Sequence, residues 1–413
     1  MQLVGKRNIY YGWVITATLA ITETISWGII YYAFSVFLKP METDLGWSRA
    51  ELTGGFSLAL LVMGGMAFLV GTWIDRHGAR FLMTFGSVLA SLLIIAWSQV
   101  TDRSHFYLIW FGLGVCAAAV LYDPAFTVVA HWFVRRRSTA LAVITFAAGL
   151  ASTIFIPLSD YLLNQFGWRG AVLRLGIFLA VTTILPHALV LRRRPDDFGL
   201  LPDGDTHLEQ SGSVSQNTTS LSEALRNRYF WQMIFAFSLS TIAVSAIRVH
   251  FIPFLTEWGI DASTAAAASG SIGLMQVAGR AVFAPLDTRY STRAMVIGVF
   301  VVQAVSMLIL LLGASPVVVV LFIVVFGTSF GAQTLARASM IADLFGSANY
   351  GRIASVMTVF LTLAGTGAPV GAAAIYDYYG SYQPVVWLVI VLAIAAAVVV
   401  MWRGGTAFSR SLS

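Results

Sequence analysis

Arg280 is the residue whose chemistry is hardest to explain by packing alone. It is the single charged residue in the hydrophobic stretch 265–286. A guanidinium cannot shed its proton as an amine can, and burying one in hydrocarbon costs about 2.5–3.5 kcal/mol even on the mildest scale. We therefore expect Arg280 to face a water-filled cavity or a counter-charge. Its forked donors suit a planar carboxylate, which predicts an anion-binding point.

The residues around this arginine are small. Such residues allow neighbouring helices to approach closely within a membrane. They are Ala266, Ala267, Ala268, Gly270, Gly273 and Gly279.

The composition indicates that this stretch lies in a bilayer. Of 413 residues, 58% are hydrophobic and only 11% are charged, and the mean hydropathy is +0.80. A soluble protein of this size is far less apolar. The net charge of +6 comes from basic residues scattered between hydrophobic runs, which is typical of topology signals and not of a nucleic-acid surface. The one cysteine, Cys116, is expected in the core.

Twelve hydrophobic runs are long enough to cross about 30 Å of hydrocarbon. We therefore predict an all-α membrane protein with twelve transmembrane helices in two pseudo-symmetric six-helix bundles. The long polar segment 192–228 predicts a cytoplasmic linker between an N-terminal bundle, 1–191, and a C-terminal bundle, 229–413. The runs are 11–38, 51–73, 81–99, 106–133, 139–162, 171–191, 229–255, 265–286, 294–312, 316–342, 353–376 and 385–402.

The distribution of lysine and arginine predicts the orientation. If the N-terminus is cytoplasmic, eighteen of these 25 residues fall on the inner side and only four, Lys39, Arg49, Arg103 and Arg169, on the outer side. Positive residues favour the cytoplasmic side, so we expect both termini there, in a multi-pass protein of the inner or plasma membrane. The first run lacks a small-residue cleavage site, so it is expected to be a membrane helix and not a removable signal.

Four residues of the first half, at or near breaks between the hydrophobic runs or within them, recur in the second half at a nearly constant spacing. The pairs are Gly46 and Gly259, Asp75 and Asp287, Pro157 and Pro369, and Gly167 and Gly380. Each half contains an even number of spans, so the two copies are predicted to be parallel. Parallel six-helix repeats are typical of transporters whose site lies between the halves.

A short polar segment follows the second run, and the second half echoes it weakly. A carboxylate and guanidinium groups beside a glycine-bearing turn can form a charge cluster that closes one face, although an ordinary inner loop would also carry positive charge. We predict gating by Asp75, Arg76, Arg80, Asp287 and Arg289. The segments read Gly71-Thr72-Trp73-Ile74-Asp75-Arg76-His77-Gly78-Ala79-Arg80 and Ala284-Pro285-Leu286-Asp287-Thr288-Arg289. The first resembles the signature of the major facilitator superfamily between helices two and three, and the twelve-span layout extends that resemblance over the whole chain.

Four finer strings resemble the branch of monocarboxylate transporters and oxalate:formate antiporters, as in a bacterial monocarboxylate transporter homologue. They are Tyr10-Tyr11-Gly12-Trp13, Gly167-Trp168-Arg169, Arg192-Arg193-Arg194-Pro195-Asp196-Asp197-Phe198-Gly199 and Tyr376-Asp377-Tyr378-Tyr379-Gly380-Ser381-Tyr382. In that branch an arginine on helix eight contacts the substrate carboxylate, and Arg280 occupies the matching place. The resemblance implies the same contact here.

The sequence also departs from that branch. Helix one lacks an interior lysine, Gln276 stands where the animal proteins have an aspartate, and run 353–376 lacks the lysine of oxalate carriers. A dicarboxylate would leave its second charge uncompensated, at a cost on the order of several kcal/mol. A monocarboxylate of the lactate or pyruvate type fits a single arginine better.

Three further titratable residues are candidates for proton coupling. Glu23 lies about 18 Å along helix one, near the midplane, and could carry a proton or play a structural part. Asp123 could be a counter-charge for Arg280 or a partner of the cluster Arg135 to Arg137. His250 could titrate in the physiological range, or it could be a histidine of the outer rim that faces the surface.

Aromatic and amide side chains could wall a small cavity, although each could equally be packing. The residues assigned to substrate binding beside Arg280 and Gln276 are Gly28, Tyr31, Tyr32, Tyr122, Phe330, Gln333 and Phe360, with Trp27 nearby. A glycine at position 28 indicates close approach by a ligand or by a neighbouring helix.

No phosphate-binding loop, metal-ligand spacing or nucleophile motif is present in the sequence, which argues against an ATP-driven pump and against an enzyme. We expect a secondary transporter that works by alternating access. Proton-coupled symport of a small monocarboxylate is the first hypothesis, and exchange of organic anions is the second. The expected partners are the anion, a proton and the bilayer, with no cofactor, no metal, no nucleic acid and a monomeric functional unit.

Overall fold

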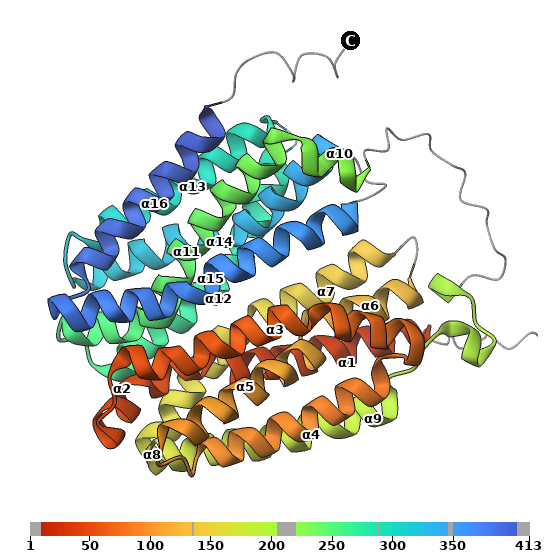
Figure 1. The fold of residues 1–413 in the computed structure, drawn as a ribbon, viewed down its shortest axis with the longest axis horizontal. Coiled ribbons are helices and arrows are strands. Elements are labelled where there is room, and N and C mark those ends of the chain that lie inside the picture. Colours follow the sequence, from red (N-terminus) through yellow and green to blue (C-terminus); the bar gives the residue numbers. More distant parts are fainter. Residues whose placement is uncertain (1–9, 134–135, 205–219, 288, 346–349, 403–413) are drawn as a thin grey trace, which may run out of the picture. The chain divides into compact units, whose positions relative to one another are not determined.

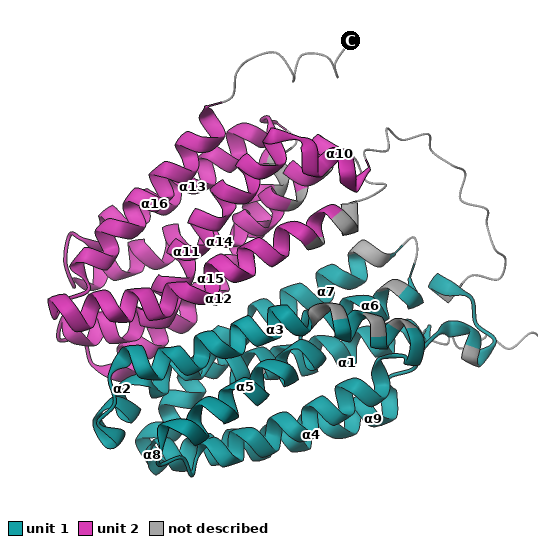
Figure 2. Ribbon diagram, in the orientation of Figure 1, with its two compact units in different colours: residues 1–213 teal, residues 214–413 magenta. Residues whose placement is uncertain are grey.

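The computed structural model describes residues 10–133, 136–204, 220–287, 289–345 and 350–402. Within them every regular element is a helix, and the chain divides into two compact units, Met1–Ser213 and Val214–Ser413 (Figure 1 and Figure 2). In unit 1 the helices are α1 Tyr11–Ser26, α2 Phe34–Leu45, α3 Arg49–His77, α4 Ala79–Trp97, α5 Arg103–Val120, α6 Tyr122–Trp132, α7 Arg137–Gly149, α8 Ala151–Leu179 and α9 Leu185–Val190. In unit 2 they are α10 Leu221–Arg226, α11 Arg228–Glu257, α12 Ala262–Asp287, α13 Thr292–Leu310, α14 Pro316–Phe345, α15 Tyr350–Tyr379 and α16 Gln383–Met401.

Each of the twelve predicted hydrophobic runs is helical over most of its length in the described chain. Nine stretches in the described residues are long and apolar enough to cross a membrane, and one of them, Thr139–Val190, contains the fifth predicted run and all but the last residue of the sixth. In hydrocarbon every backbone polar group must be bonded within the protein, which a helix achieves inside one segment. The chain is therefore a multi-pass helical membrane protein.

Several predicted runs are not uniform helices. The first contains a π-helical segment, Trp27–Tyr32, between α1 and α2, and the sixth contains another, Ala180–Ile184, between α8 and α9. The fourth run, expected as one span, is broken at Leu121 between α5 and α6. The polar segment 192–228 holds the short helix α10, whose capping box joins Ser220 and Glu223.

The repeat seen in the sequence has a geometric counterpart. Gly46 and Gly259 both have positive φ, +66° and +82°, as do Gly167 and Gly380, both at +66°. Glycine adopts this left-handed conformation without the steric penalty of a side chain. Two helices are equivalent in the same way: α4 spans Ala79–Trp97 and α13 spans Thr292–Leu310. The number of residues from the start of α4 to the start of α13 equals the number from Gly46 to Gly259, and the same holds for the two helix ends.

Helix caps recur at the same interval. The Ser48 side chain accepts the Glu51 backbone N–H, and at the equivalent place in the second half the Asp261 carboxylate accepts the Thr264 backbone N–H. Side-chain caps of this kind satisfy donors that the first helical turn leaves unpaired. Hydrogen bonds from the side chain and backbone of Thr264 hold the pKa of the Asp261 carboxyl below its ordinary value. The two halves therefore share their helix starts as well as their turns.

The repeat also pairs two arginines with the ends of helices. Arg80 Nε donates to the Ala188 carbonyl at 2.6 Å, near the end of α9. Its counterpart in the second half, Arg293, donates to the carbonyls of Val400 and Met401, at the end of α16. A guanidinium there satisfies carbonyls that lack a helical partner and complements the negative end of the helix dipole.

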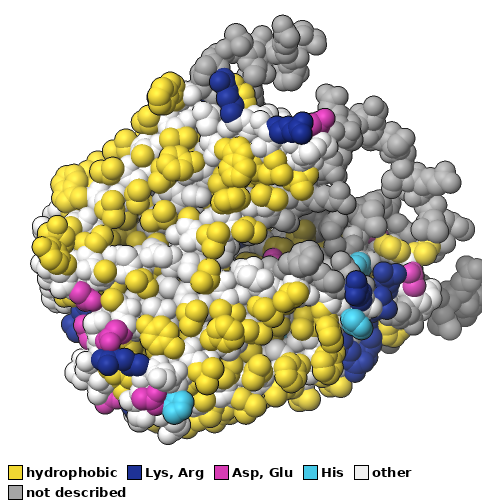
Figure 3. All heavy atoms as spheres, viewed as in Figure 1, with side chains coloured by type: hydrophobic (Ala, Val, Ile, Leu, Met, Phe, Trp, Pro, Cys, Tyr) yellow, Lys and Arg dark blue, Asp and Glu magenta, His cyan; other side chains and the backbone are white. Residues whose placement is uncertain are grey.

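Each unit has its own core. In unit 1 it includes Ile15, Met83 and Trp132, and in unit 2 Phe230, Phe300 and Phe345, all at most 1% exposed. Figure 3 shows hydrophobic side chains along the flanks of the helices and charged side chains gathered toward their ends.

An apolar groove of about 320 Å³ between α1 and α9 is lined by well-exposed Ile21, Leu185 and Leu189. Such surfaces suit contact with lipid tails.

The arginine caps lead to a first prediction. Replacing Arg293 by methionine keeps most of the side-chain volume and removes the hydrogen bonds to the end of α16. We expect a loss of about 1 kcal/mol of stability, measured as a lower thermal unfolding midpoint of the purified protein. Arg289→Met, which alters an exposed side chain on the same loop, is the matched control. Equal midpoints for both variants would contradict the cap.

Candidate anion-binding site

Helices α12 and α14 touch backbone to backbone. A Cβ at Gly279 would lie 2.1 Å from the Thr328 carbonyl oxygen, and one at Gly331 would lie 2.0 Å from that of Gln276. These distances are too short for any side chain, so only glycine permits the contact. Gly327 faces Ile272 and Met275, and the next turn, Gly331, faces Gln276. The close contact therefore extends over more than one turn of each helix.

This contact determines where Arg280 lies. Arg280 follows Gly279 directly and is half-buried, and Gln276, one turn earlier, is 5% exposed. On α14, Gln333 lies two residues after Gly331 and is 8% exposed, and Phe330 is half-buried. Four residues that the sequence assigned to substrate binding thus lie at matched depth on two touching helices.

A second arginine lies near the same aromatic ring. Arg248, on α11, has its guanidinium carbon 4.8 Å from the ring centroid of Phe330 and is half-buried. A cation over an aromatic face is attracted by the negative charge of the π system. The sequence analysis did not assign this residue to the site. The signal was available, because an arginine inside a hydrophobic run is as costly here as at position 280.

Gln333 belongs to a chain of buried hydrogen bonds. The Ser240 hydroxyl on α11 donates to Gln303 Oε1 at 2.6 Å, and Gln303 Nε2 on α13 donates to Gln333 Oε1 at 3.0 Å. Gln303 was also missed, although it is the single amide in the mostly apolar helix α13. Buried polar groups need such partners, since leaving one unpaired is expensive.

In unit 1 the predicted aromatic residues of helices one and four form one cluster. The Trp27 ring lies 5.3 Å from Tyr31 and 4.9 Å from Tyr122, and Tyr31 contacts Tyr32 and Phe56, each at 5.2 Å. The structure therefore brings together three of the assigned tyrosines around Trp27. Phe56, on α3, was not assigned from the sequence.

Glu23 lies at the edge of this cluster. It is completely buried, and its Oε2 accepts the Trp27 indole N–H at 3.1 Å. Its other oxygen, Oε1, is buried without a hydrogen-bond partner in the described part of the chain. The π-helical segment begins at Trp27, one turn after Glu23, and such irregular turns are frequent at functional sites.

Asp123 lies in the first turn of α6, directly after the break at Leu121. It is exposed at the surface of unit 1 and close enough to Glu23 for the two carboxyl groups to interact electrostatically. Of the cluster proposed as its structural partner, Arg135 and the side chain of Arg137 lie outside the described residues. Arg136 is exposed, and its backbone N–H is bonded to Asp203.

Gly28 faces a neighbouring helix. A Cβ at this position would lie 2.2 Å from the ring of Phe155 on α8. Of the two expectations for this glycine, the geometry supports the close approach of a helix, so its place among the substrate-binding residues has no geometric support.

Phe360 of α15 packs against Trp231 of α11, with ring centroids 5.3 Å apart, and is 37% exposed.

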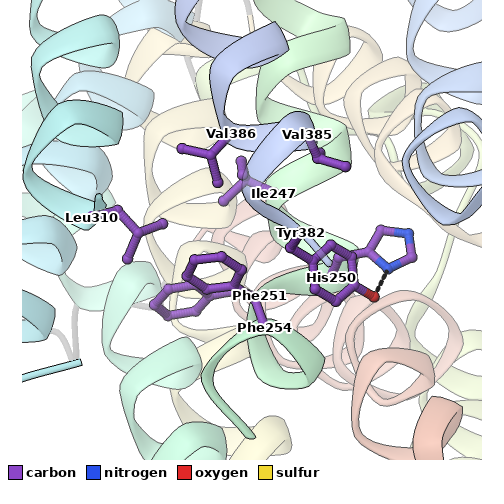
Figure 4. A pocket seen from close by; sticks show the side chains of 8 residues that line it. All are labelled: Ile247, His250, Phe251, Phe254, Leu310, Tyr382, Val385 and Val386. Carbon is purple, nitrogen blue, oxygen red and sulfur yellow. Dashed lines mark hydrogen bonds between the residues drawn. The ribbon is translucent and has the colours of Figure 1, made fainter. Parts of the chain in front are cut away.

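The rim-facing interpretation of His250 is wrong. His250 is 2% exposed and bridges three helices of unit 2: its Nδ1 is 2.8 Å from the Tyr382 hydroxyl and its Nε2 is 2.9 Å from the Pro369 carbonyl oxygen. The carbonyl can only accept, so Nε2 carries the proton toward it. Figure 4 shows the pair beside a void of about 10 Å³ walled by Phe251, Phe254 and other apolar side chains. That void holds at most one water molecule.

The predicted gating residues are only partly described. The side chains of Asp75 and Asp287 lie outside the described residues, and those of Arg76 and Arg289 are exposed. Gly78 makes the expected tight turn, with φ of +80°. Arg80 is engaged with the Ala188 carbonyl inside unit 1, so it caps α9, and a gating role for it remains a prediction.

The helices and their repeat define a membrane transporter fold of two six-helix halves. The sequence profile of the Major Facilitator Superfamily matches residues 17–257 and 249–410. The chain belongs to the major facilitator superfamily. The members of this superfamily are transporters and not enzymes.

The curated relatives that the chain matches include monocarboxylate transporters. Monocarboxylate transporter 11 of Homo sapiens is 28% identical over 291 residues, which is 67% of this chain and 58% of the relative. Monocarboxylate transporter 12 of Rattus norvegicus is 25% identical over 308 residues, 68% of this chain and 61% of the relative. The matches thus span about three fifths of those relatives' length and support membership of the monocarboxylate transporter branch.

Solved structures support the fold. A bacterial homologue of the human lysosomal transporter Spinster, inward-facing and unoccupied, has a TM-score of 0.72 at 14% identity, covering 96% of both chains. The nucleoside transporter NupG has a TM-score of 0.71 at 14% identity, covering 94% of this chain and 99% of its own. At such identity the likeness concerns the arrangement of helices.

The contact between α12 and α14 leads to a second prediction. Gly331→Ala must push the two backbones apart, which we expect to cost about 1–3 kcal/mol and to lower the thermal unfolding midpoint. Gly298→Ala is the matched control, because a Cβ there meets nothing within 4 Å and alanine favours a helix by up to about 1 kcal/mol. A Gly331→Ala protein as stable as the wild type would disprove the contact.

Proposed function

We propose that the chain is a secondary active transporter that carries a small monocarboxylate, of the lactate or pyruvate type, by alternating access. The observation that carries this proposal is a half-buried arginine, Arg280, within the membrane-spanning helix α12, which packs closely against α14, the helix of Phe330 and Gln333. Membership of the monocarboxylate transporter branch supports it.

In the proposed mechanism the carboxylate binds Arg280 through two parallel N–H···O bonds. The carboxylate offsets the positive charge of the guanidinium, and a site with less net charge is cheaper to enclose. The two halves then rock about the occupied site, so that it opens to the other side. Phe330 would pack against the apolar part of the substrate.

Proton-coupled symport is the favoured mode. Glu23 is fully buried with one oxygen unpartnered in the described part of the chain, and Asp123 interacts with it electrostatically. Two nearby carboxyl groups cannot both ionise cheaply, so one of them would hold a proton. Binding one proton with one monocarboxylate would make the transported load electroneutral.

The proposed setting is the inner or plasma membrane, with both termini in the cytoplasm and a monomer as the functional unit. The excess of arginine and lysine on the inner side supports this orientation. Ion pairs further reduce the positive charge on the outer side of unit 1. There Arg49 pairs with Glu42, Arg103 with Glu51 and Arg169 with Asp44.

Exchange of organic anions, as in the oxalate:formate antiporter type, is the second candidate. Arg248, with its guanidinium over Phe330, favours it, because a second cation could compensate the second charge of a dicarboxylate. Symport requires a pH gradient for accumulation, whereas exchange requires an internal anion. Uptake into vesicles with each driving force separates the two candidates.

The third prediction concerns the carboxylate contact. Arg280→Lys keeps the charge but removes the planar fork, so we expect uptake of L-lactate into proteoliposomes to fall at least about tenfold in kcat/KM. Arg174→Lys is the matched control, since Arg174 is exposed and stacks on Phe166 in unit 1. Unchanged kcat/KM in the Arg280 variant would refute the bidentate pairing.

The fourth prediction concerns Glu23. Glutamine resembles the protonated carboxyl and cannot release a proton, so Glu23→Gln should abolish the stimulation of L-lactate uptake by an inward proton gradient. Exchange of internal for external lactate should persist, because it needs no net proton movement. Asp102→Asn, at an exposed helix cap, is the control. Retention of full proton stimulation in the Glu23 variant would eliminate this residue as the carrier.

A further inference from the structure

The apolar groove between α1 and α9 lies on the surface of unit 1. Its most exposed side chains are Ile21, Leu185 and Leu189, at 61%, 60% and 61%. Neighbouring apolar side chains that stay exposed indicate contact with an apolar partner. In a bilayer that partner is either the hydrocarbon chain of a lipid or a further transmembrane helix. The other lining residues are Thr18, Thr22, Pro186 and Val190.

The size of the groove favours a lipid chain over a helix. The α9 residues that line it, from Leu185 to Val190, extend over about 8 Å at the helical rise of about 1.5 Å per residue. A volume of about 320 Å³ over that length gives a mean cross-section of about 40 Å². A helix with its side chains is about 10–12 Å wide and requires about 80–110 Å². The groove is therefore too narrow for a helix and suits a single hydrocarbon chain.

Two guanidinium groups contact the end of α9 beside this groove. Arg80 Nε donates to the Ala188 carbonyl at 2.6 Å, and Arg192 Nη1 donates to the Leu191 carbonyl at 2.9 Å. These two carbonyls flank the last two residues of α9, both of which line the groove. Carbonyls at the C-terminal end of a helix point beyond that end. Both guanidinium groups therefore lie where the groove leaves the hydrocarbon, a place that we call the mouth of the groove.

Aromatic contacts connect Arg192 with α1, the other wall of the groove. The guanidinium carbon of Arg192 lies 5.9 Å from the ring centroid of Phe198, and the Phe198 ring lies 5.5 Å from that of Tyr11 at the start of α1. The Tyr11 hydroxyl in turn donates to the Val190 carbonyl at 2.9 Å, which joins the ends of the two helices. Arg192 is thus linked by contacts to both helices that form the groove.

The mouth has an excess of positive charge. Arg193 and Arg194 follow Arg192 and are exposed, and the first turn of α1 contains no acidic residue. Asp196, exposed on the same segment, offsets only one of these positive charges. Guanidinium groups bind phosphate oxygens through paired, charge-assisted hydrogen bonds. Basic residues next to the ends of membrane helices attract anionic lipid headgroups in this way.

We propose that this groove binds one anionic phospholipid, with an acyl chain between α1 and α9 and the phosphate group held by Arg80 and Arg192. The groove determines where the chain lies, and the arginines select a negatively charged headgroup. The bound lipid joins the first and last membrane-spanning segments of unit 1. The site lies in the other unit from Arg280, so it does not depend on the proposed function.

Native mass spectrometry of the purified full-length protein tests the headgroup contact. The protein in detergent is mixed with phosphatidylglycerol and phosphatidylcholine that carry the same acyl chains. We expect the wild type to bind one phosphatidylglycerol at least about fivefold more tightly than phosphatidylcholine, which is the factor that one arginine near the membrane surface contributes. Arg192→Met should weaken the binding of phosphatidylglycerol about fivefold and leave that of phosphatidylcholine unchanged.

The matched control for this variant is Arg228→Met. Arg228 is exposed at the start of α11 in unit 2, with its guanidinium over the Tyr229 ring. Its replacement removes one positive charge away from the groove, so we expect no change in lipid binding. Equal weakening by the two variants would mean that phosphatidylglycerol follows net charge alone and would overturn the proposal.

A matched pair of tryptophan substitutions tests the position of the acyl chain. Ile21→Trp fills the groove and should weaken the binding of phosphatidylglycerol at least about fivefold, because the added ring occupies the place of the chain. Ile177→Trp changes an isoleucine of α8 that is 49% exposed and lies outside the groove, so it should have no effect. Unchanged binding in Ile21→Trp would show that the lipid lies elsewhere and would refute the site.

The same spectra report the alternative occupants of the groove. A dimer of the wild type that is lost in Ile21→Trp would show that a second copy of the chain covers it. Equal affinity of the wild type for the two lipids would show a site without preference for charge. Either result overturns the proposal.

Thermal unfolding verifies the fold of each variant. If Arg192→Met or Ile21→Trp fails to fold, Arg80→Met or Leu185→Trp takes its place, with the same expected loss and the same control. The mixture contains no carboxylate substrate, so a failure of this inference leaves the proposed function standing.

Discussion

The contact of two helix backbones at Gly279 and Gly331 governs the arrangement of the candidate site. In a bilayer the apolar side chains gain little by leaving lipid, so helices associate where small residues allow close packing. Here that packing joins α12 to α14 with no side chain between them. Arg280, Gln276, Phe330 and Gln333 acquire a common depth as a result. A larger residue at either glycine would separate the arginine from the two side chains of α14.

Two irregular places in the helices of unit 1 lie next to acidic side chains. The π-helical segment begins at Trp27, the hydrogen-bond partner of Glu23, and the break at Leu121 precedes Asp123 by two residues. Loss of regular hydrogen bonding inside a membrane is costly unless other groups satisfy the backbone. That two such places fall beside Glu23 and Asp123 is consistent with a functional origin.

The sequence repeat distinguishes residues that support the helical fold from residues of the candidate site. Turn glycines, helix caps and the arginines that cap α9 and α16 recur at equivalent places in the two halves. The intramembrane charges do not, because the positions equivalent to Glu23 and Arg280 are Ala236 and Ala67. The first half therefore carries the buried carboxyl group of Glu23, and the second half carries the half-buried guanidinium of Arg280. In the proposed mechanism this divergence would place the proton and the anion in different halves, whereas the shared elements preserve the fold of each bundle.

The amino-acid sequence alone was sufficient for the helical membrane fold, its repeat and the superfamily, and it singled out Arg280 as a candidate whose role stays a prediction. Hydrophobic run length, positive-residue bias and the cost of a charge in hydrocarbon are local quantities that can be summed along a chain. The partners of His250, Gly28, Arg80 and Gln333 could not be read in this way. Each depends on a residue of another helix that is distant in the sequence, as with Phe155 against Gly28 and Gln303 beside Gln333. Only the tertiary structure decided these contacts, because hydrogen bonds and van der Waals contacts act over a few ångströms in space and carry no mark in the sequence.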